Sequence, residues 1–266
     1  MGLALAESMR ALQRAGGKAF VPFLTAGYPD VDTFRALLRC TAACDLVEVG
    51  LPFSDPIADG PSICHSSEVA LAQGMHADLM FDLLADERRR PPAIVMTYVN
   101  PVLAYGPDAF LGRARECGVQ GLILTDLPPE EPALLEAAEE HGIATVLLVS
   151  PTTPAERMAA IAERATGFLY CVAVTGTTGA RTELSGQARD TVERLRQVTR
   201  LPVVVGFGIS TPEHVRDACR FADGVVVGSA LVELVRHAPP GSPGVELFAR
   251  RVRELADAAH ASAGRH

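Results

Sequence analysis

The stretch LPVVVGFGISTPEHVRDACRFADGVVVGS (201–229) contains the repeating unit from which we predict the fold. Two short valine-rich runs stand on either side of PEHVRDACR (212–220), whose apolar residues recur near the helical period. Thr211 is a typical N-cap residue, and Pro212 suits the first turn of a helix. A strand, a helix and a second strand in this order predict two parallel strands joined by a crossover helix.

The same unit recurs along the whole chain. Eight short apolar runs are separated by segments of helical period: KAFVPFLTA (18–26), DLVEVG (45–50), PAIVMTYV (92–99), VQGLILTD (119–126), IATVLLVS (143–150), TGFLYCVAV (166–174), LPVVVGFG (201–208) and ADGVVVGS (222–229). Because these runs are apolar almost throughout, we expect strands buried on both faces, as in a parallel sheet. Eight such units fit a closed barrel better than an open sheet. We therefore predict an α/β fold, a (β/α)₈ TIM barrel, with an extra N-terminal helix.

The length of 266 residues is compatible with one barrel domain. We expect the single domain to cover 1–266, with the barrel proper at 18–237. The Pro/Gly-rich segment 238–244 is expected to be a connector, followed by a C-terminal helix at 244–260. Two connections are longer than the others, 51–61 after strand two and 175–186 after strand six. Long loops at the carboxyl ends of barrel strands are where chemistry is usually placed.

Charge and cysteine usage exclude several classes of function. The net charge is −8 and the arginines are scattered, which gives no electrostatic footprint for nucleic acid or an anionic membrane. The sequence shows no apolar run long enough to span a bilayer and no signal peptide, so we expect a cytoplasmic protein. The six cysteines are dispersed, which favours buried free thiols and argues against a metal site.

Glycine-rich turns predict where an anion binds. They follow three consecutive strands, at 175–179, at 206–208 and at Gly228-Ser229. Glycine lets backbone N–H groups approach an anion, and a short helix beginning at Ser229 would add its positive dipole end. The segments after strands three and four, TYVNPV and LTDLPP, are expected to be loops without such turns. We therefore predict one phosphate group on the ligand, bound near strands six to eight.

Glu48 is the first candidate for catalysis. It lies in LVEVG (46–50), inside an apolar strand, where a carboxylate is costly unless it is paired or functional. Leu46, Glu48 and Gly50 share one face, and if that face points into the barrel the carboxyl lies near its mouth. Burial would raise the pKa of Glu48, as a proton donor near neutral pH requires. A structural carboxylate bonded to a neighbouring hydroxyl is the alternative.

The second candidate cannot be selected by spacing alone. Asp59 lies in the loop LPFSDPIADGP (51–61), which also contains Ser54 and Asp55. The only lysine, Lys18, precedes strand one at the wrong end of the barrel, which disfavours a Schiff-base aldolase. Most histidines lie on predicted helices or in the tail, and only His65 is near the site, which disfavours a metal-dependent aldolase. Acid/base chemistry by carboxylates on a phosphorylated substrate remains.

The segment VEVGLPFSDPIADGPSI closely resembles the signature of tryptophan synthase α chains. The resemblance covers residues 18–235 through further segments: AFVPFLTAGYPD, MTYVNPVLAYG, GLILTDLPPEE, GFLYCVAVTGTTGART, VVVGFGIS and VVVGSALV. It implies retro-aldol cleavage of indole-3-glycerol phosphate to indole and glyceraldehyde 3-phosphate, in the last steps of tryptophan biosynthesis.

The resemblance also implies roles for individual residues. Glu48 would be the acid/base at indole C3 and the 3′-hydroxyl, Asp59 would accept the indole N1–H, and Tyr170 matches the family's active-site tyrosine. The remaining matches are the residues of the indole pocket or its lid, Phe23, Ile63, Tyr98, Thr178 and Phe207, and those of the phosphate site, Gly179, Gly208, Gly228 and Ser229.

A partner is implied as well. The family resemblance implies a β subunit in an α₂β₂ heterotetramer, with 52–60 near the contact and 175–186 as a lid. Pyridoxal phosphate would belong to that β subunit, so no cofactor is expected in this chain. Cys64, His65 and Val69 depart from the residues common in the family and put the local helix surface and the partner contact in doubt.

Other functions remain open from the sequence. A stand-alone lyase releasing free indole would use the same site residues. A regulatory subunit that binds a phosphorylated ligand without catalysis would not need Glu48, Asp59 and Tyr170. A phosphate-binding isomerase of histidine or tryptophan biosynthesis would more often have Asp or Cys at the end of strand one, where this chain has Thr25-Ala26-Gly27.

Overall fold

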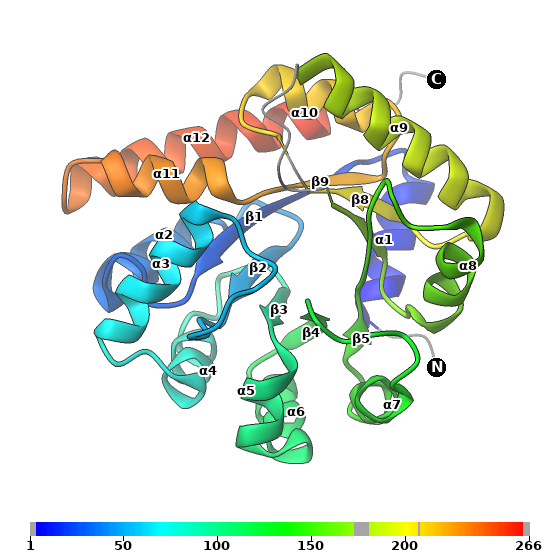
Figure 1. The fold of residues 1–266 in the computed structure, drawn as a ribbon. Coiled ribbons are helices and arrows are strands. Elements are labelled where there is room, and N and C mark those ends of the chain that lie inside the picture. Colours follow the sequence, from blue (N-terminus) through cyan, green and yellow to red (C-terminus); the bar gives the residue numbers. More distant parts are fainter. Residues whose placement is uncertain (1–3, 173–180, 207, 263–266) are drawn as a thin grey trace.

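A parallel barrel is the centre of the molecule (Figure 1). The computed structural model describes residues 4–172, 181–206 and 208–262, without the side chains of 181–185. The strands are β1 (Ala19–Thr25), β2 (Val47–Gly50), β3 (Ala93–Thr97), β4 (Val119–Leu124), β5 (Ala144–Thr145), β6 (Leu147–Val149), β7 (Leu169–Cys171), β8 (Val203–Val205) and β9 (Gly224–Val227). Their order is β5-β4-β3-β2-β1-β9-β8-β7-β6, and neighbouring strands in this order that pair do so in parallel.

The fifth predicted strand closes the ring. It is divided at Val146 into β5, which pairs with β4, and β6, which pairs with β7. The N–H of Val146 donates to Leu122 O of β4 at 3.0 Å, so the chain passes from one neighbour to the other within a few residues. The two segments at the ends of the strand order are therefore one continuous stretch of chain. This confirms the predicted (β/α)₈ barrel and adds a break in its fifth strand.

Helices surround the barrel on its outer side (Figure 1). They are α2 (Val31–Cys40), α3 (Pro61–Ala72), α4 (Ala77–Asp86), α5 (Val99–Tyr105), α6 (Pro107–Glu116), α7 (Pro132–Glu140), α8 (Ala155–Arg164), α9 (Arg181–Val198), α10 (Pro212–Cys219), α11 (Ser229–His237) and α12 (Ser242–His260). The expected N-terminal helix is α1 (Ala4–Arg14), and the expected helix after the last strand, α11, begins at Ser229.

Three boundaries differ from the sequence predictions. Helix α9 begins at Arg181, so the second half of the expected loop 175–186 is helical. Helix α12 begins at Ser242, ahead of the predicted start at 244, because its proline falls in the first turn, where no N–H is needed. The segment TYVNPV, expected to be a loop, enters α5 at Val99, and Pro101 is tolerated there for the same reason.

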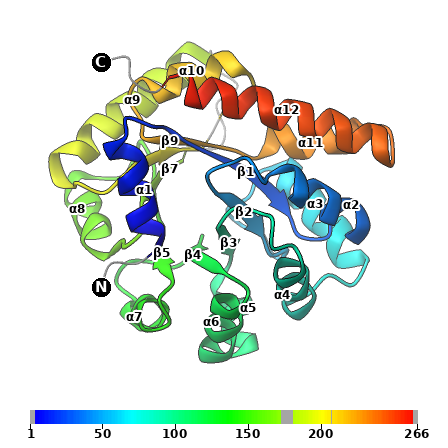
Figure 2. The ribbon, with the colours of Figure 1, turned by 180° about the vertical axis from the view of Figure 1, so that it is seen from behind.

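Alternation along the strands separates an inner from an outer core. Leu46 belongs to the cluster inside the barrel, whereas Val47 and Val49 pack in the layer between strands and helices. Glu48 therefore faces inward, as strand alternation requires. Helix α1 packs against β4 and β5 and lies over the barrel in Figure 2. Its Leu5 is fully buried in the inner cluster and closes the amino end of the barrel.

Candidate active site

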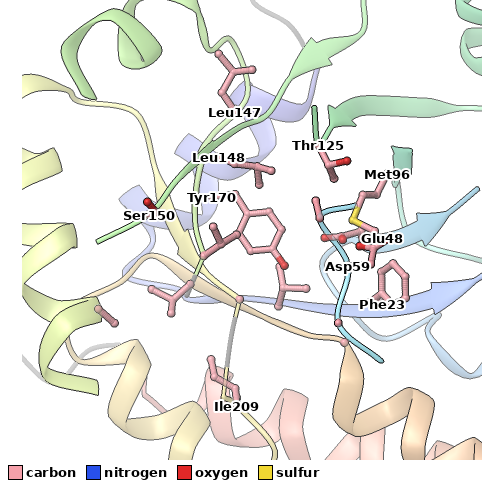
Figure 3. A pocket seen from close by; sticks show the side chains of 18 of the residues that line it. Phe23, Glu48, Asp59, Met96, Thr125, Leu147, Leu148, Ser150, Tyr170 and Ile209 are labelled. Atoms are coloured by element: carbon pink, nitrogen blue, oxygen red, sulfur yellow. The ribbon is translucent and has the colours of Figure 1, made fainter. Parts of the chain in front are cut away.

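A cavity of about 1110 Å³ opens at the carboxyl ends of the strands. Of the residues singled out from the sequence, those that line it are Phe23, Glu48, Asp59, Ile63, Tyr170, Gly208, Gly228 and Ser229. Figure 3 shows Glu48 and Asp59 close together on one side, with the Tyr170 hydroxyl pointing toward that side. Strands far apart in sequence therefore bring two carboxylates, a phenol and glycine turns to one space.

Glu48 is an almost fully buried carboxyl, with 1% of its surface exposed. The register of β1 and β2 sets it beside Phe23, and its Oε2 has no hydrogen-bond partner among the described residues. Burial and the nearby charge of Asp59 raise the pKa of Glu48 to about 8. The carboxyl is therefore largely protonated at neutral pH and can donate a proton. Within the part of the chain that the structure describes, no hydroxyl bonds this oxygen, Oε2, which argues against a purely structural carboxylate.

Asp59 ends the loop that leads into α3, where Gly60 is the N-cap residue. Its N–H donates to Pro56 O at 3.2 Å, within a turn that aims the side chain into the cavity. Burial raises the pKa of Asp59, while a hydrogen bond from Tyr98 lowers it. The two influences oppose each other and burial is the larger, so the pKa of Asp59 remains above its usual value.

Tyr98 lies behind Asp59 and does not line the cavity. Its hydroxyl oxygen accepts the N–H of Ala58 at 3.0 Å, and its ring packs against Phe53 with centroids 5.3 Å apart. Burial is the main cause that raises the pKa of Tyr98 to about 12, so the phenol keeps the proton that it donates to Asp59. The structure thus places Tyr98 as a support for the Asp59 loop.

Tyr170 enters the cavity from β7 because Gly206 leaves room for its ring. A Cβ atom at Gly206 would lie 2.0 Å from Cε2 and 2.2 Å from the hydroxyl oxygen of Tyr170. Burial raises the pKa of Tyr170 well above its usual value, and the charges of Glu48 and Asp59 act in the same direction. The phenol therefore remains a hydrogen-bond donor at the site.

The opposite part of the cavity is formed by backbone. Gly208 has φ +65°, a conformation that favours glycine, and no atom of the described residues lies within 4 Å of where a Cβ would be. Gly228 is the N-cap of α11, and its carbonyl accepts the N–H groups of Leu231 and Val232. The N–H of Ser229 comes before these first helical bonds, so it can serve an anion. Thr178, Gly179 and Phe207 lie outside the described residues.

Sequence reasoning missed several residues of the cavity wall. They are Met96, Leu124, Thr125, Leu148 and Ile209. Two of them follow inner-core residues at a spacing of two, Met96 after Ile94 and Leu148 after Val146. Strand alternation carried to the carboxyl end of each strand would have found these two.

The structure also bears on the lysine, metal and membrane alternatives that the sequence raised. Lys18 lies at the amino end of the barrel, where its Nζ donates to Ala222 O at 2.8 Å. Among the described residues, no three His, Cys, Asp or Glu side chains gather as a metal site would require. Within the same part of the chain, no helix combines the length and the hydropathy needed to cross a bilayer.

The model of the family described as "Tryptophan synthase alpha chain" matches residues 9–260. The chain belongs to the tryptophan synthase alpha chain family. It is 45% identical over 243 residues to the tryptophan synthase alpha chain of Roseiflexus sp. (strain RS-1), covering 89% of this chain and 93% of that protein. It is 47% identical over 242 residues to that of Gloeobacter violaceus, covering 89% and 88%.

Solved structures agree with this assignment. The tryptophan synthase alpha subunit of Legionella pneumophila superposes with a TM-score of 0.88 at 33% identity, covering 97% of this chain and 98% of that one. A chain of Mycobacterium tuberculosis tryptophan synthase gives 0.89 at 35% identity, covering 98% and 99%. The family comprises lyases of tryptophan synthesis, and this chain is an enzyme of that class.

Proposed function

We propose that the chain cleaves indole-3-glycerol phosphate by a retro-aldol reaction into indole and D-glyceraldehyde 3-phosphate, with Glu48 and Asp59 as its acid/base pair. The observation that carries the proposal is the pairing of two carboxylates whose charges interact inside one cavity, where one Glu48 oxygen has no hydrogen-bond partner among the residues that the structure describes. Two carboxylates in different environments can hold different protonation states at one pH.

Glu48 begins the reaction in its protonated form. It gives its proton to indole C3, which becomes tetrahedral and leaves a positive charge at N1. The ionised Glu48 then takes the proton of the 3′-hydroxyl, the C3–C3′ bond breaks, and its electron pair returns to the ring as the aldehyde forms. The net result restores protonated Glu48. A raised pKa suits this exchange because donor and acceptor states lie close in free energy near neutral pH.

Asp59 acts on the nitrogen of the same ring. Protonation at C3 makes the N1–H more acidic and positively charged, and a carboxylate that accepts this hydrogen bond stabilises the intermediate. Burial raises the pKa of Asp59, and the hydrogen bond from Tyr98 opposes that rise, which favours the ionised form that this role needs. Tyr170, held as a neutral phenol, supplies a donor near both carboxylates.

The phosphate is assigned to the glycine side of the cavity. Gly208, Gly228 and Ser229 offer backbone groups and the start of α11, whose dipole favours an anion. We include Gly179, matched from the family pattern, in the same site. Binding at a group remote from the breaking bond orients the indole toward Glu48. Phe23 and Ile63 provide apolar surface for the ring.

Lysine and metal chemistry are not part of the proposal. Lys18 lies at the opposite end of the barrel from the cavity, so it cannot form a Schiff base with a ligand bound there. The carboxylate mechanism needs no metal ion. We also propose a β subunit as partner, in an α₂β₂ assembly in the cytoplasm, with pyridoxal phosphate held by that subunit only.

Substitution of Glu48 tests the reaction. Glu48→Gln preserves size and burial but cannot shuttle a proton, so indole release should fall by about 10²- to 10⁴-fold. Glu87→Gln is the matched control, since Glu87 is also buried but pairs with Arg39 away from the cavity. Binding of glycerol 3-phosphate should survive in both variants. Cleavage at the normal rate by Glu48→Gln would refute the mechanism.

Adding a β subunit separates the proposal from a stand-alone lyase. The rate of indole release by the purified chain is measured alone and with tryptophan synthase β subunit. We expect the β subunit to increase this rate strongly. In a two-enzyme complex, binding of the partner can trigger closure of the active site, and a closed site is the active one. Fast release without the partner and no activation would favour the stand-alone enzyme instead.

A further inference from the structure

A pair of buried hydroxyls joins the barrel to the helix that follows Asp59. Thr25 ends β1 with 3% of its surface exposed, and Ser66 lies on α3 with none exposed. Their oxygens, Thr25 Oγ1 and Ser66 Oγ, are 2.6 Å apart. Neither residue was predicted from the sequence to belong to the site, and neither lines the cavity.

The direction of these hydrogen bonds follows from a second contact. The hydroxyl of Ser66 donates to Ile63 O at 2.9 Å, which uses its only proton. Thr25 must therefore donate to Ser66. The result is a chain from Thr25 through Ser66 to the carbonyl of Ile63, in the first turn of α3. Buried bonds of this kind fix geometry because leaving a member unpaired is costly.

The first turn of α3 is continuous with Asp59. The N–H of Cys64 donates to Gly60 O at 3.0 Å, and its thiol lies 3.5 Å from Asp59 O. The position of this turn thus decides where the Asp59 carboxylate stands. Ile63, whose carbonyl ends the hydroxyl chain, itself contributes to the cavity wall.

The other end of the hydroxyl chain is attached to the strand that fixes Glu48. Within β1, Thr25 is two residues beyond Phe23, and the parallel register pairs Phe23 with Glu48 and Thr25 with Gly50. One strand therefore holds Glu48 through backbone pairing and α3 through a side chain. A rigid element that contacts both groups can set their separation.

We propose that the Thr25–Ser66 hydroxyl pair is a positioning device that sets the distance and orientation of Asp59 relative to Glu48. Thr25 and Ser66 do not touch the reacting atoms and act through the first turn of α3. The inference rests on the proposed function, since it concerns the same two carboxylates. It assigns to two buried hydroxyls a role in the rate of the reaction beyond their contribution to folding.

The consequence is measurable because Glu48 senses its neighbours. Asp59, from the loop before α3, is the charge that raises the pKa of Glu48 alongside burial, and Tyr170 faces both from β7. If Asp59 moves away, the repulsion weakens and the pKa of Glu48 falls. A residue that only supports folding would not move this value.

The experiment uses Thr25→Val, which keeps the shape and removes the hydroxyl, and Ser66→Ala. For indole release from indole-3-glycerol phosphate by the full chain, kcat should fall by roughly 10- to 100-fold, as expected for a displacement of about 1 Å. KM should change little because the phosphate is held elsewhere. The alkaline limb of the pH–rate profile should shift to lower pH. Thr25→Ser keeps the hydroxyl, so its kcat and its alkaline limb should match those of the wild-type chain. The Thr25→Val/Ser66→Ala double variant should be no slower than either single variant.

Thr41→Val is the matched control. Thr41 is fully buried and its hydroxyl donates to Leu38 O at 2.7 Å, at the end of α2 and away from the cavity. It should lose stability without changing kcat or the pH limb. If Thr25→Val and Ser66→Ala behave like Thr41→Val, the positioning role is wrong. If Glu48→Gln itself cleaves normally, the proposed function fails, whatever the hydroxyl pair does.

Discussion

The two ends of the barrel are built on the same strands but treat their buried polar groups in opposite ways. At the amino end, the carboxylate of Asp223 accepts the N–H of Val203 at 2.8 Å, is bonded by Gln13 at 3.2 Å and pairs with Arg196. At the carboxyl end, Glu48 is buried as deeply but keeps an oxygen without a described partner.

Packing follows the same division. The amino end is closed by α1, and a Cβ at Gly121 or Gly167 would lie 2.7 or 3.0 Å from the side chain of Leu5, so both glycines make room for it. The carboxyl end remains a cavity of about 1110 Å³. The comparison teaches that one end is arranged for stability and the other gives up stability for a reactive site.

Truncation of Leu5, which closes the amino end of the barrel, should affect stability without affecting catalysis. Leu5→Ala removes a fully buried side chain from the inner core, and the free energy of unfolding should fall by about 2–5 kcal/mol. Urea unfolding measures it. Leu103→Ala, at a leucine that is 53% exposed, is the matched control and should change stability much less. The rate of indole release by the folded Leu5→Ala enzyme should remain normal. A loss of activity larger than the fraction of unfolded protein would contradict the separation of stability and catalysis between the two ends of the barrel.

Filling the space at Gly206 should damage the reactive end. In Gly206→Ala the new methyl meets the ring of Tyr170, which must move, at a cost of about 1–3 kcal/mol. We expect indole release to fall by a factor of ten or more, because the phenol leaves its place beside the carboxylates. Gly112→Ala is the control, because no atom of the described residues lies within 4 Å of a Cβ built there. A crystal structure of Gly206→Ala with Tyr170 unmoved and full activity would contradict this account.

The smallest effect concerns stability and pH. The folded chain binds the Glu48 proton more tightly than the unfolded chain, since burial raises its pKa from 4.5 to about 8. This contribution to stability is fully present when the pH is below the Glu48 pKa of the unfolded chain, 4.5. It is lost as the pH rises toward the pKa of the folded chain, about 8. Relative to Glu48→Gln, the wild-type chain should therefore lose about 2 kcal/mol between pH 6 and pH 8. Equal pH dependence of the two chains in urea unfolding would argue that Glu48 is ionised in the folded state.

Much of the fold was predictable because strands and the alternation of their side chains depend on neighbouring residues in the sequence. Apolar runs located each strand, and the period of two placed Glu48 on the inner face together with Leu46. The break of strand five at Val146 was not predictable, because it depends on closing the ring between two neighbours. Helix α5 was missed because Val99 and Pro101 have low helix propensity, so its tertiary setting must supply the difference.

The site was predictable where chemistry is unusual for its surroundings. Glu48 was identified because it is a carboxylate in an apolar strand. Asp59 shares its loop with Ser54 and Asp55 and was selected only by the family resemblance. The structure separates them, since Asp59 lines the cavity and Ser54 bonds Asp55 on the surface at 2.6 Å. Thr25 and Ser66 gave no signal, because a contact between residues 41 positions apart is visible only after folding.

A titration of Glu48 tests the central claim most directly. Carboxyl carbons of glutamate are labelled with ¹³C, and the spectrum of Glu48→Gln identifies the Glu48 signal by its absence. We predict an apparent pKa of about 8 in the wild-type chain and a lower value in Asp59→Asn, where one source of repulsion is gone. A Glu48 pKa near 4.5, unchanged by Asp59→Asn, would contradict a buried proton donor coupled to a second carboxylate.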